Sequence, residues 1–130
     1  MLIRTSHGER LDASNLPDGC PASSAGLFVI RADGTGRFDR HYHDFSEIWL
    51  VAAGSGTIRV GDEHHHVQPG DIAYTPAGIE HDIIAVAEEL HVFWLSAPLP
   101  DGGSGAHLHR EPDLAAKHLV PVVPGVSAEA

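Results

Sequence analysis

Two histidines and a glutamate stand at a spacing that could hold a metal ion. His41 and His43 are separated by one residue, and Glu47 follows after a connection of three residues. On a β-strand, residues i and i+2 project from the same face, so both imidazoles would point the same way. A connection this short can turn the chain back and bring the carboxylate opposite the imidazoles. Three such ligands leave coordination positions for water or a substrate; the alternative is a polar hairpin end that binds nothing.

Three further side chains could take part in chemistry. Trp49 shares strand parity with Glu47, which predicts that it faces the interior, either as core or stacked on a substrate. Tyr74, if buried, needs a hydrogen-bond partner and could serve as a proton donor or a substrate anchor. His91 would be a plausible general base if it faced the interior; the alternative is a surface imidazole.

Other reactive residue types have simpler explanations. The run His64-His65-His66 lies at a predicted hairpin tip, which favours solvated side chains over adventitious metal binding. His107 and His109 repeat the His-x-His spacing in a glycine-rich loop, which favours a surface loop over a second metal site, although such a loop could cap a pocket mouth. Cys20 has no activating base near it in the sequence, so an inert thiol is expected.

The elements that would position these residues are short strands. Segments 26–31, 57–60, 72–75, 81–86 and 90–96 read as strands separated by Gly- and Pro-containing turns, with 54–56 as one of the turns. Residues 26–97 would hold about eight strands, which indicates an antiparallel sandwich or barrel. We expect one domain, with an N-terminal arm (1–25), a barrel core (26–97) and a C-terminal loop and tail (98–130). A short strand is predicted at 2–4 and a short helix at 112–118.

A second motif stands downstream of the first. Gly70 is followed after five residues by Pro76-Ala77-Gly78 and then by His81. Together with the first motif, which ends at Gly54, this order and spacing resemble the two motifs of the cupin superfamily over about residues 27–97. Two departures are visible: Gly34 and Gly36 straddle the family's leading glycine, and Ala85 replaces its final asparagine.

The resemblance implies an all-β fold, a single-domain cupin jelly-roll β-barrel with a short C-terminal helix or tail. It also implies that His41, His43, Glu47 and His81 meet inside the barrel on one divalent metal ion per chain. Three histidines and a glutamate serve Zn, Fe, Mn, Ni, Co and Cu, so the metal is left open.

Composition excludes several classes of partner. The formal net charge is −10, and only eight residues are Lys or Arg, which argues against nucleic acid and anionic membranes. A single cysteine and the lack of an apolar run of signal-peptide length at the start predict a cytoplasmic protein. A homodimer is expected because short sheets leave edges that need cover, with residues 119–126 as a candidate cover for a neighbour.

The resemblance implies several functions rather than one. We expect a metal-dependent enzyme acting on a small molecule, as a dioxygenase, an isomerase or cyclase, or a lyase. The alternative class is a non-catalytic ligand-binding or auxiliary module; a sensor domain is disfavoured because no helix-turn-helix segment is evident. Residues 41–49 also look like the zinc cupin domains of hydrazine-forming biosynthetic enzymes, which join two nitrogen atoms.

Overall fold

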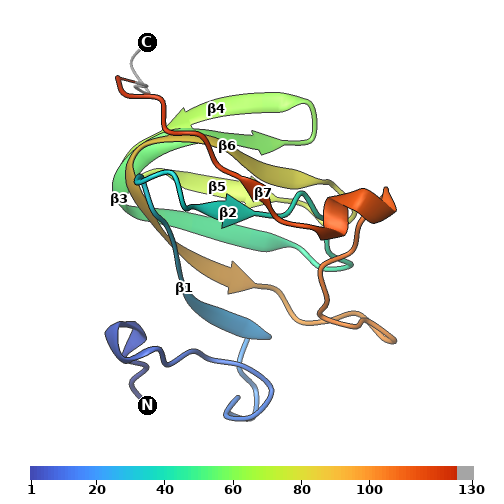
Figure 1. Ribbon diagram of the computed structural model, residues 1–130. Helices are drawn as coiled ribbons and strands as arrows, with labels where there is room; N and C mark the ends of the chain where they lie inside the picture. Colours follow the sequence, from blue (N-terminus) through green and yellow to red (C-terminus); the bar gives the residue numbers. More distant parts are fainter. Residues whose placement is uncertain (126–130) are drawn as a thin grey trace.

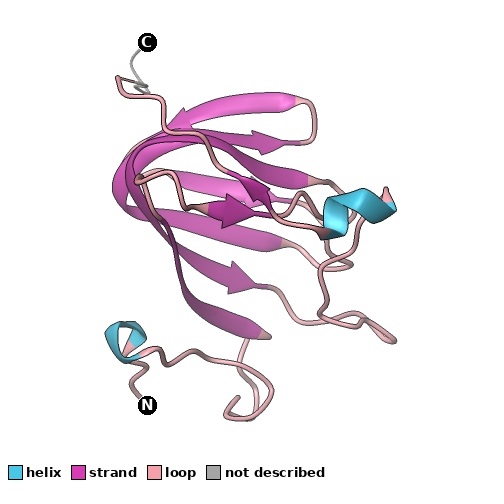
Figure 2. Ribbon diagram, viewed as in Figure 1, coloured by secondary structure: helices cyan, strands magenta, loops and turns pink. Residues whose placement is uncertain are grey.

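Seven β-strands and two short 3-10 helices make up residues 1–125, the part of the chain that this computed structural model describes (Figure 1 and Figure 2). In chain order they are η1 (Thr5–His7), β1 (Ser24–Ile30), β2 (Arg37–Phe38), β3 (Glu47–Val60), β4 (Glu63–Val67), β5 (Ile72–Thr75), β6 (His81–Ser96), η2 (Pro112–Ala115) and β7 (His118–Leu119). No helix among residues 1–125 is long and apolar enough to cross a membrane.

The strands form a large curled sheet and a small ribbon. The large sheet has the order β1-β6-β3-β4, with β5 paired to β3, and every pairing in it is antiparallel. The ribbon is the antiparallel pair β2-β7, which lies across the concave side of the large sheet (Figure 1). This arrangement confirms the predicted all-β jelly roll.

Two strands are much longer than predicted. β3 runs through 54–56, where a turn was expected, and β6 joins the predicted strands 81–86 and 90–96. Gly54 has a φ of 78°, and a Cβ built on it would lie 1.9 Å from the carbonyl oxygen of Glu89. The β3–β6 register shifts at several points around this glycine. The glycines therefore bend the paired strands around the core instead of ending them.

The apolar core lies between the large sheet and the ribbon. Alternate residues of β3 and β6 point inward, so that Trp49 and Val51 meet Leu90 and Val92, all four almost completely buried. Phe38 of the ribbon packs on the same cluster. This packing gives the site described below a rigid floor.

The ends of the chain differ from the sequence prediction. Residues 2–4 are not a strand, and the predicted helix at 112–118 is only the 3-10 turn η2 followed by β7. The segment after η2 covers this chain's own core, because Val120 is 1% exposed and Val122 forms a bridge with Val86. Leu119 and Val123 stay exposed, so the expectation that the tail covers a neighbour remains a prediction; Val126 lies outside the described residues.

Candidate metal centre

The four side chains predicted to share a metal come together at one end of the barrel interior. His41 and His43 precede β3, whereas Glu47 and His81 are the first residues of β3 and β6. Backbone hydrogen bonds in both directions pair His41 with His81, at 3.2 and 2.8 Å. The Nε2 atoms of His41 and His81 lie 3.0 Å apart, and His43 Nε2 lies 3.6 Å from Glu47 Oε2.

Burial favours the neutral form of two imidazoles in this cluster, His43 and His81. All four residues are less than 9% exposed. Burial lowers the pKa of His81 to about 2, with the neighbouring His41 adding to the effect. Burial also lowers the pKa of His43, although the Glu47 carboxylate acts in the opposite direction. Neutral imidazole is the form that ligates metals.

Hydrogen bonds aim the free nitrogen atoms at one another. His41 Nδ1 donates to the carbonyl oxygen of Asp39 at 2.5 Å, and His43 Nδ1 donates to that of Ala106 at 3.3 Å. These bonds leave the Nε2 lone pairs of both rings facing the cluster centre, as the hydrogen-bond partners of metal-binding histidines do in metal sites. Three imidazole nitrogens and a carboxylate are a donor set suited to a divalent transition metal, so the residues present fit such an ion.

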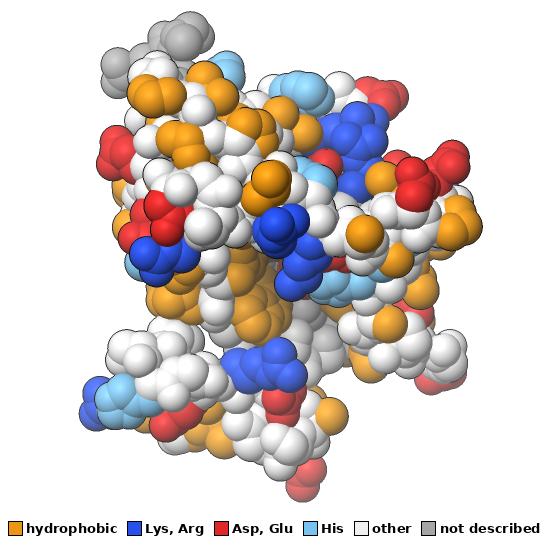
Figure 3. Space-filling view, in the orientation of Figure 1, with side chains coloured by type: hydrophobic (Ala, Val, Ile, Leu, Met, Phe, Trp, Pro, Cys, Tyr) orange, Lys and Arg blue, Asp and Glu red, His pale blue; other side chains and the backbone are white. Residues whose placement is uncertain are grey.

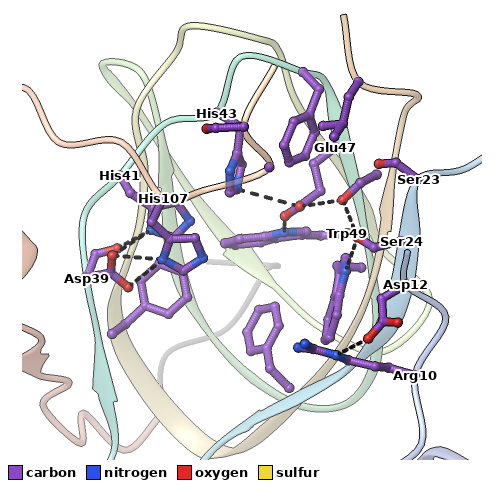
Figure 4. A pocket seen from close by; sticks show the side chains of 18 of the residues that line it. Arg10, Asp12, Ser23, Ser24, Asp39, His41, His43, Glu47, Trp49 and His107 are labelled. Atoms are coloured by element: carbon purple, nitrogen blue, oxygen red, sulfur yellow. Dashed lines mark hydrogen bonds and ion pairs between the residues drawn. The ribbon is translucent and has the colours of Figure 1, made fainter. Parts of the chain in front are cut away.

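The cluster opens onto a cavity of about 540 Å³ (Figure 4). Every odd-numbered residue from 37 to 49 lines this cavity, which fits an extended segment that turns one row of side chains inward. Its walls combine polar and charged side chains with five large aromatic rings, those of Phe28, Phe38, Phe45, Trp49 and Trp94. A concave apolar space with a few convergent polar groups is typical of a small-molecule site.

Asp39, His107 and His109 also belong to the site. The Asp39 carboxylate is buried and accepts hydrogen bonds from His107 Nδ1 at 2.9 Å and from His109 Nε2 at 2.7 Å. The rings of His107 and His41 stack with centroids 3.7 Å apart, on one wall of the cavity (Figure 4). Burial raises the pKa of Asp39, but hydrogen bonds from the histidines, His107 foremost, outweigh it and hold this pKa well below its usual range.

Sequence reasoning underrated these three residues. The loop that carries His107 and His109 lies at the surface, as predicted, but His107 also lines the cavity and both rings bind a buried carboxylate. The suggestion that the loop caps the pocket fits this placement. Asp39 has the strand parity of His41 and His43, and that parity is the signal that could have found it.

The structure separates Tyr74 and His91 from the cavity. Tyr74 is 58% exposed on the outer face of β5, where its hydroxyl lies 3.1 Å from Ser46 Oγ. His91 faces outward on β6, where Leu90 and Val92 occupy the inward positions. Strand alternation therefore corrects the expectation that Tyr74 and His91 serve this cavity.

Trp49, in contrast, lies inside as predicted. It is 2% exposed and crosses the middle of the cavity (Figure 4). His64 and His65 are exposed on β4, and His66 Nδ1 lies 2.8 Å from Thr57 Oγ1 outside the cluster. Cys20 is partly buried and lies outside the cavity lining.

The family model of the AraC-like ligand binding domain matches residues 24–101, well over half of the chain. The chain belongs to this family, within the cupin superfamily. The predicted family resemblance is thereby confirmed, and the match covers β1 to β6 together with the four clustered side chains.

Two curated relatives share this part of the cupin. An uncharacterised protein of Streptomyces coelicolor is 33% identical over 75 residues, which cover 58% of this chain and 70% of that protein. An uncharacterised protein of Sinorhizobium fredii is 32% identical over 71 residues, which cover 55% of this chain and 33% of that protein. The chain thus spans about a third of the length of one relative.

Solved structures show the same fold. A cupin 2 conserved barrel domain protein from Rhodopseudomonas palustris matches 82% of this chain and 68% of its own, with a TM-score of 0.61 and 20% identity. The DMSP lyase DddQ of Ruegeria pomeroyi matches 68% of this chain and 45% of its own, with a TM-score of 0.56 and 19% identity. The salicylate 1,2-dioxygenase of Pseudoaminobacter salicylatoxidans matches 62% of this chain and 21% of its own, with a TM-score of 0.53 and 16% identity.

Proposed function

We propose that this cupin is a metal-dependent enzyme that acts on a small molecule held in the aromatic cavity. One observation carries the proposal: ligand atoms of His43, Glu47 and His81 lie within 4.8 Å of one another, with His41 Nε2 3.0 Å from His81 Nε2, all buried beside a cavity large enough for a small organic ligand. His41, His43, Glu47 and His81 would hold one divalent ion. When bound, such an ion supplies Lewis acidity or, if it is redox-active, electron transfer.

The protein's own residues would orient the substrate and move protons. Hydrogen bonds to carbonyl groups fix the tautomers of His41 and His43, and Trp49 and Ser96 fix the Glu47 carboxylate. The aromatic walls would exclude water from the reacting end of the substrate.

His107 is the best-placed proton carrier. Its Nδ1 donates to the Asp39 carboxylate, so the lone pair resides on Nε2 when the ring is neutral. The ring lines the cavity beside the cluster. We therefore assign to His107 Nε2 the role of general base or acid that the sequence suggested for Tyr74 or His91.

Metal analysis of purified protein tests the proposal. Wild-type protein should retain about one divalent ion per chain, and His43→Ala and His81→Ala should each lose most of it. His65→Ala, which removes an exposed imidazole outside the cluster, should retain the full amount. Full metal occupancy in the His43→Ala/His81→Ala double variant would refute the ligand set.

A second measurement separates a catalytic from a structural metal. The barrel buries a core of its own, so metal-free protein should keep its β-rich circular dichroism with a modest loss of thermal stability. If removal of the metal unfolds the chain, the ion is structural and the enzyme proposal fails.

The second candidate is a binding module without turnover. The matching family is named for ligand binding, and the cavity would serve a bound ligand equally well. A ligand recovered unchanged after prolonged incubation with metal-loaded protein would favour this candidate. Among enzymes, the three reaction classes named above stay open, as does the hydrazine-forming zinc cupin suggested by residues 41–49; a dominant zinc content would favour the latter.

A further inference from the structure

Basic side chains are concentrated around the cavity. The chain has a net charge of −10 and only eight Lys and Arg residues, yet three of them, Arg10, Arg37 and Lys117, line this one space. Figure 3 views this side of the molecule, where Lys and Arg side chains lie on both rims of a hollow with an apolar interior. A basic rim in an acidic protein concentrates anions at the cavity.

Two of these cations lack an acidic partner. Arg10 forms an ion pair with Asp12 at 3.0 Å and reaches into the cavity from the side opposite Asp39 (Figure 4). Neither Arg37 nor Lys117 has a carboxylate within 4.0 Å among residues 1–125. Their charges are therefore available to a ligand.

The ribbon holds the two cations close together. Arg37 is the first residue of β2, and Lys117 immediately precedes β7, the strand that pairs with β2. Arg37 is exposed and lines the cavity at its rim, four residues before His41. That separation corresponds to roughly 13 Å of extended chain, so a molecule reaching from Arg37 to the His–Glu cluster must be several bonds long.

Aromatic rings line the path between the two ends. Three of the four Phe residues and both Trp residues face the cavity. Phe28, Phe38 and Trp49 form a mutual cluster with ring centroids 5.2 to 5.9 Å apart. Such walls favour a flat apolar body over a polyhydroxylated one, which would need hydrogen-bond partners along its length.

We infer that the cavity accepts a carboxylic acid with an apolar, ring-bearing body. The carboxylate lies at the rim between Arg37 and Lys117, the ring lies against Phe28, Phe38 and Trp49, and the far end meets the His–Glu cluster. The inference rests on the proposed function only in naming the end that reacts; the acid-binding rim is independent of the metal.

Tryptophan fluorescence offers a direct test, because both tryptophans of the chain line the cavity. The probes are 3-phenylpropionate and its uncharged isostere 3-phenylpropionamide. They are titrated into protein as purified and into chelator-treated protein. The variant Arg37→Gln/Lys117→Gln removes the rim charges, and Arg31→Gln, which removes an exposed cation paired with Asp33 outside the cavity, is the matched control.

The acid should bind more tightly than the amide, and its affinity should fall with added salt. The double variant should bind the acid roughly three- to tenfold more weakly than wild type does, with an unchanged affinity for the amide. The Arg31→Gln variant should bind both probes as wild type does. The same preference should persist in chelator-treated protein. Equal affinity for the acid and the amide would overturn the inference. So would a preference for the acid that survives in the double variant, or one that is lost when the metal is removed. Absence of metal from the purified protein would instead count against the proposed function alone.

Discussion

At the scale of single residues, both oxygens of the Glu47 carboxylate accept hydrogen bonds from neighbouring side chains. Trp49 Nε1 donates to Oε1 at 2.6 Å, and Ser96 Oγ donates to Oε2 at 2.9 Å. Ser96 is in turn 3.1 Å from Ser24 Oγ, to which Trp94 Nε1 donates at 3.0 Å. The two indoles therefore have different relations to the carboxylate, one direct and one through two hydroxyl groups.

This difference yields the first prediction. Trp49→Phe removes the N–H that orients Glu47 and should weaken metal binding roughly tenfold, as loss of an outer-shell partner commonly does. Trp94→Phe, the matched control, removes an indole from the same cavity and should change metal affinity by much less. Competition titration against a chromophoric chelator measures both. Equal affinities in the two variants would show that the Trp49–Glu47 bond does not tune the site.

At the scale of elements, the bend in β3 depends on Gly54. A Cβ at this position would meet the backbone of Glu89 on the paired strand β6, and backbone cannot move aside cheaply. Gly54→Ala should therefore lower the melting temperature by more than about 10 °C or prevent folding. Gly70→Ala is the control: Gly70 also has a positive φ, but nothing lies within 4 Å of its Cβ position. Only the backbone strain of about 1–2 kcal/mol should appear there. Similar losses in both variants would contradict the steric argument.

The loop that carries His107 and His109 is a second element, and its histidine side chains are attached to the rest of the chain at Asp39. Asp39→Asn would replace a charged carboxylate, whose Oδ2 accepts from both rings, with a neutral amide that forms weaker hydrogen bonds. The amide of Leu108, which donates to the carbonyl oxygen of Tyr42, should then exchange with deuterium roughly tenfold faster or more. Asp33→Asn, in an exposed turn remote from the loop, should leave this exchange rate unchanged. Unaltered exchange in Asp39→Asn would mean that the loop is held by other contacts.

Sequence predicted the parts of the fold that rest on local periodicity. Alternation found β1 and β5, and the two motifs brought together the four side chains of the cluster. The sequence-based prediction failed at Gly54 because a glycine with positive φ can lie in a turn or in a β-bulge. Which of the two forms depends on the pairing with the neighbouring strand. The same prediction missed the Asp39–His107 contact because 68 residues separate the two, a pairing that no local pattern encodes.

At the scale of the whole molecule, the outer face of the large sheet is an unexpected apolar surface. Leu50 of β3 pairs with Phe93 of β6 and with Ile72 of β5, and all three side chains are more than 36% exposed. Tyr74 and Leu95 extend the same face. Contiguous exposed apolar surface is typical of a protein interface. This face is therefore a better candidate than the tail for the interface of the homodimer that the sequence predicts.

We predict that the chain is a dimer in solution and that Leu50→Glu/Phe93→Glu converts it to a monomer, because two buried carboxylates per subunit would face an apolar interface. Leu119→Glu, an exposed position in the tail segment, should leave the dimer intact. Light scattering at micromolar concentration measures the masses. A monomeric wild type would contradict the predicted dimer. Dissociation caused by Leu119→Glu alone would show that the interface is formed by the tail.

The pairing of Ser96 with Glu47 has a consequence for the order of assembly during synthesis. The four proposed ligands all lie between positions 41 and 81, but the strand that orients the carboxylate, β6, ends at 96 and pairs with β1, from an earlier part of the chain. Contacts across 49 and 72 residues form late, because long loops must close first. A chain still emerging from the ribosome can thus display every proposed ligand without possessing the site, so the proposed metal centre would be complete only after β6 has docked.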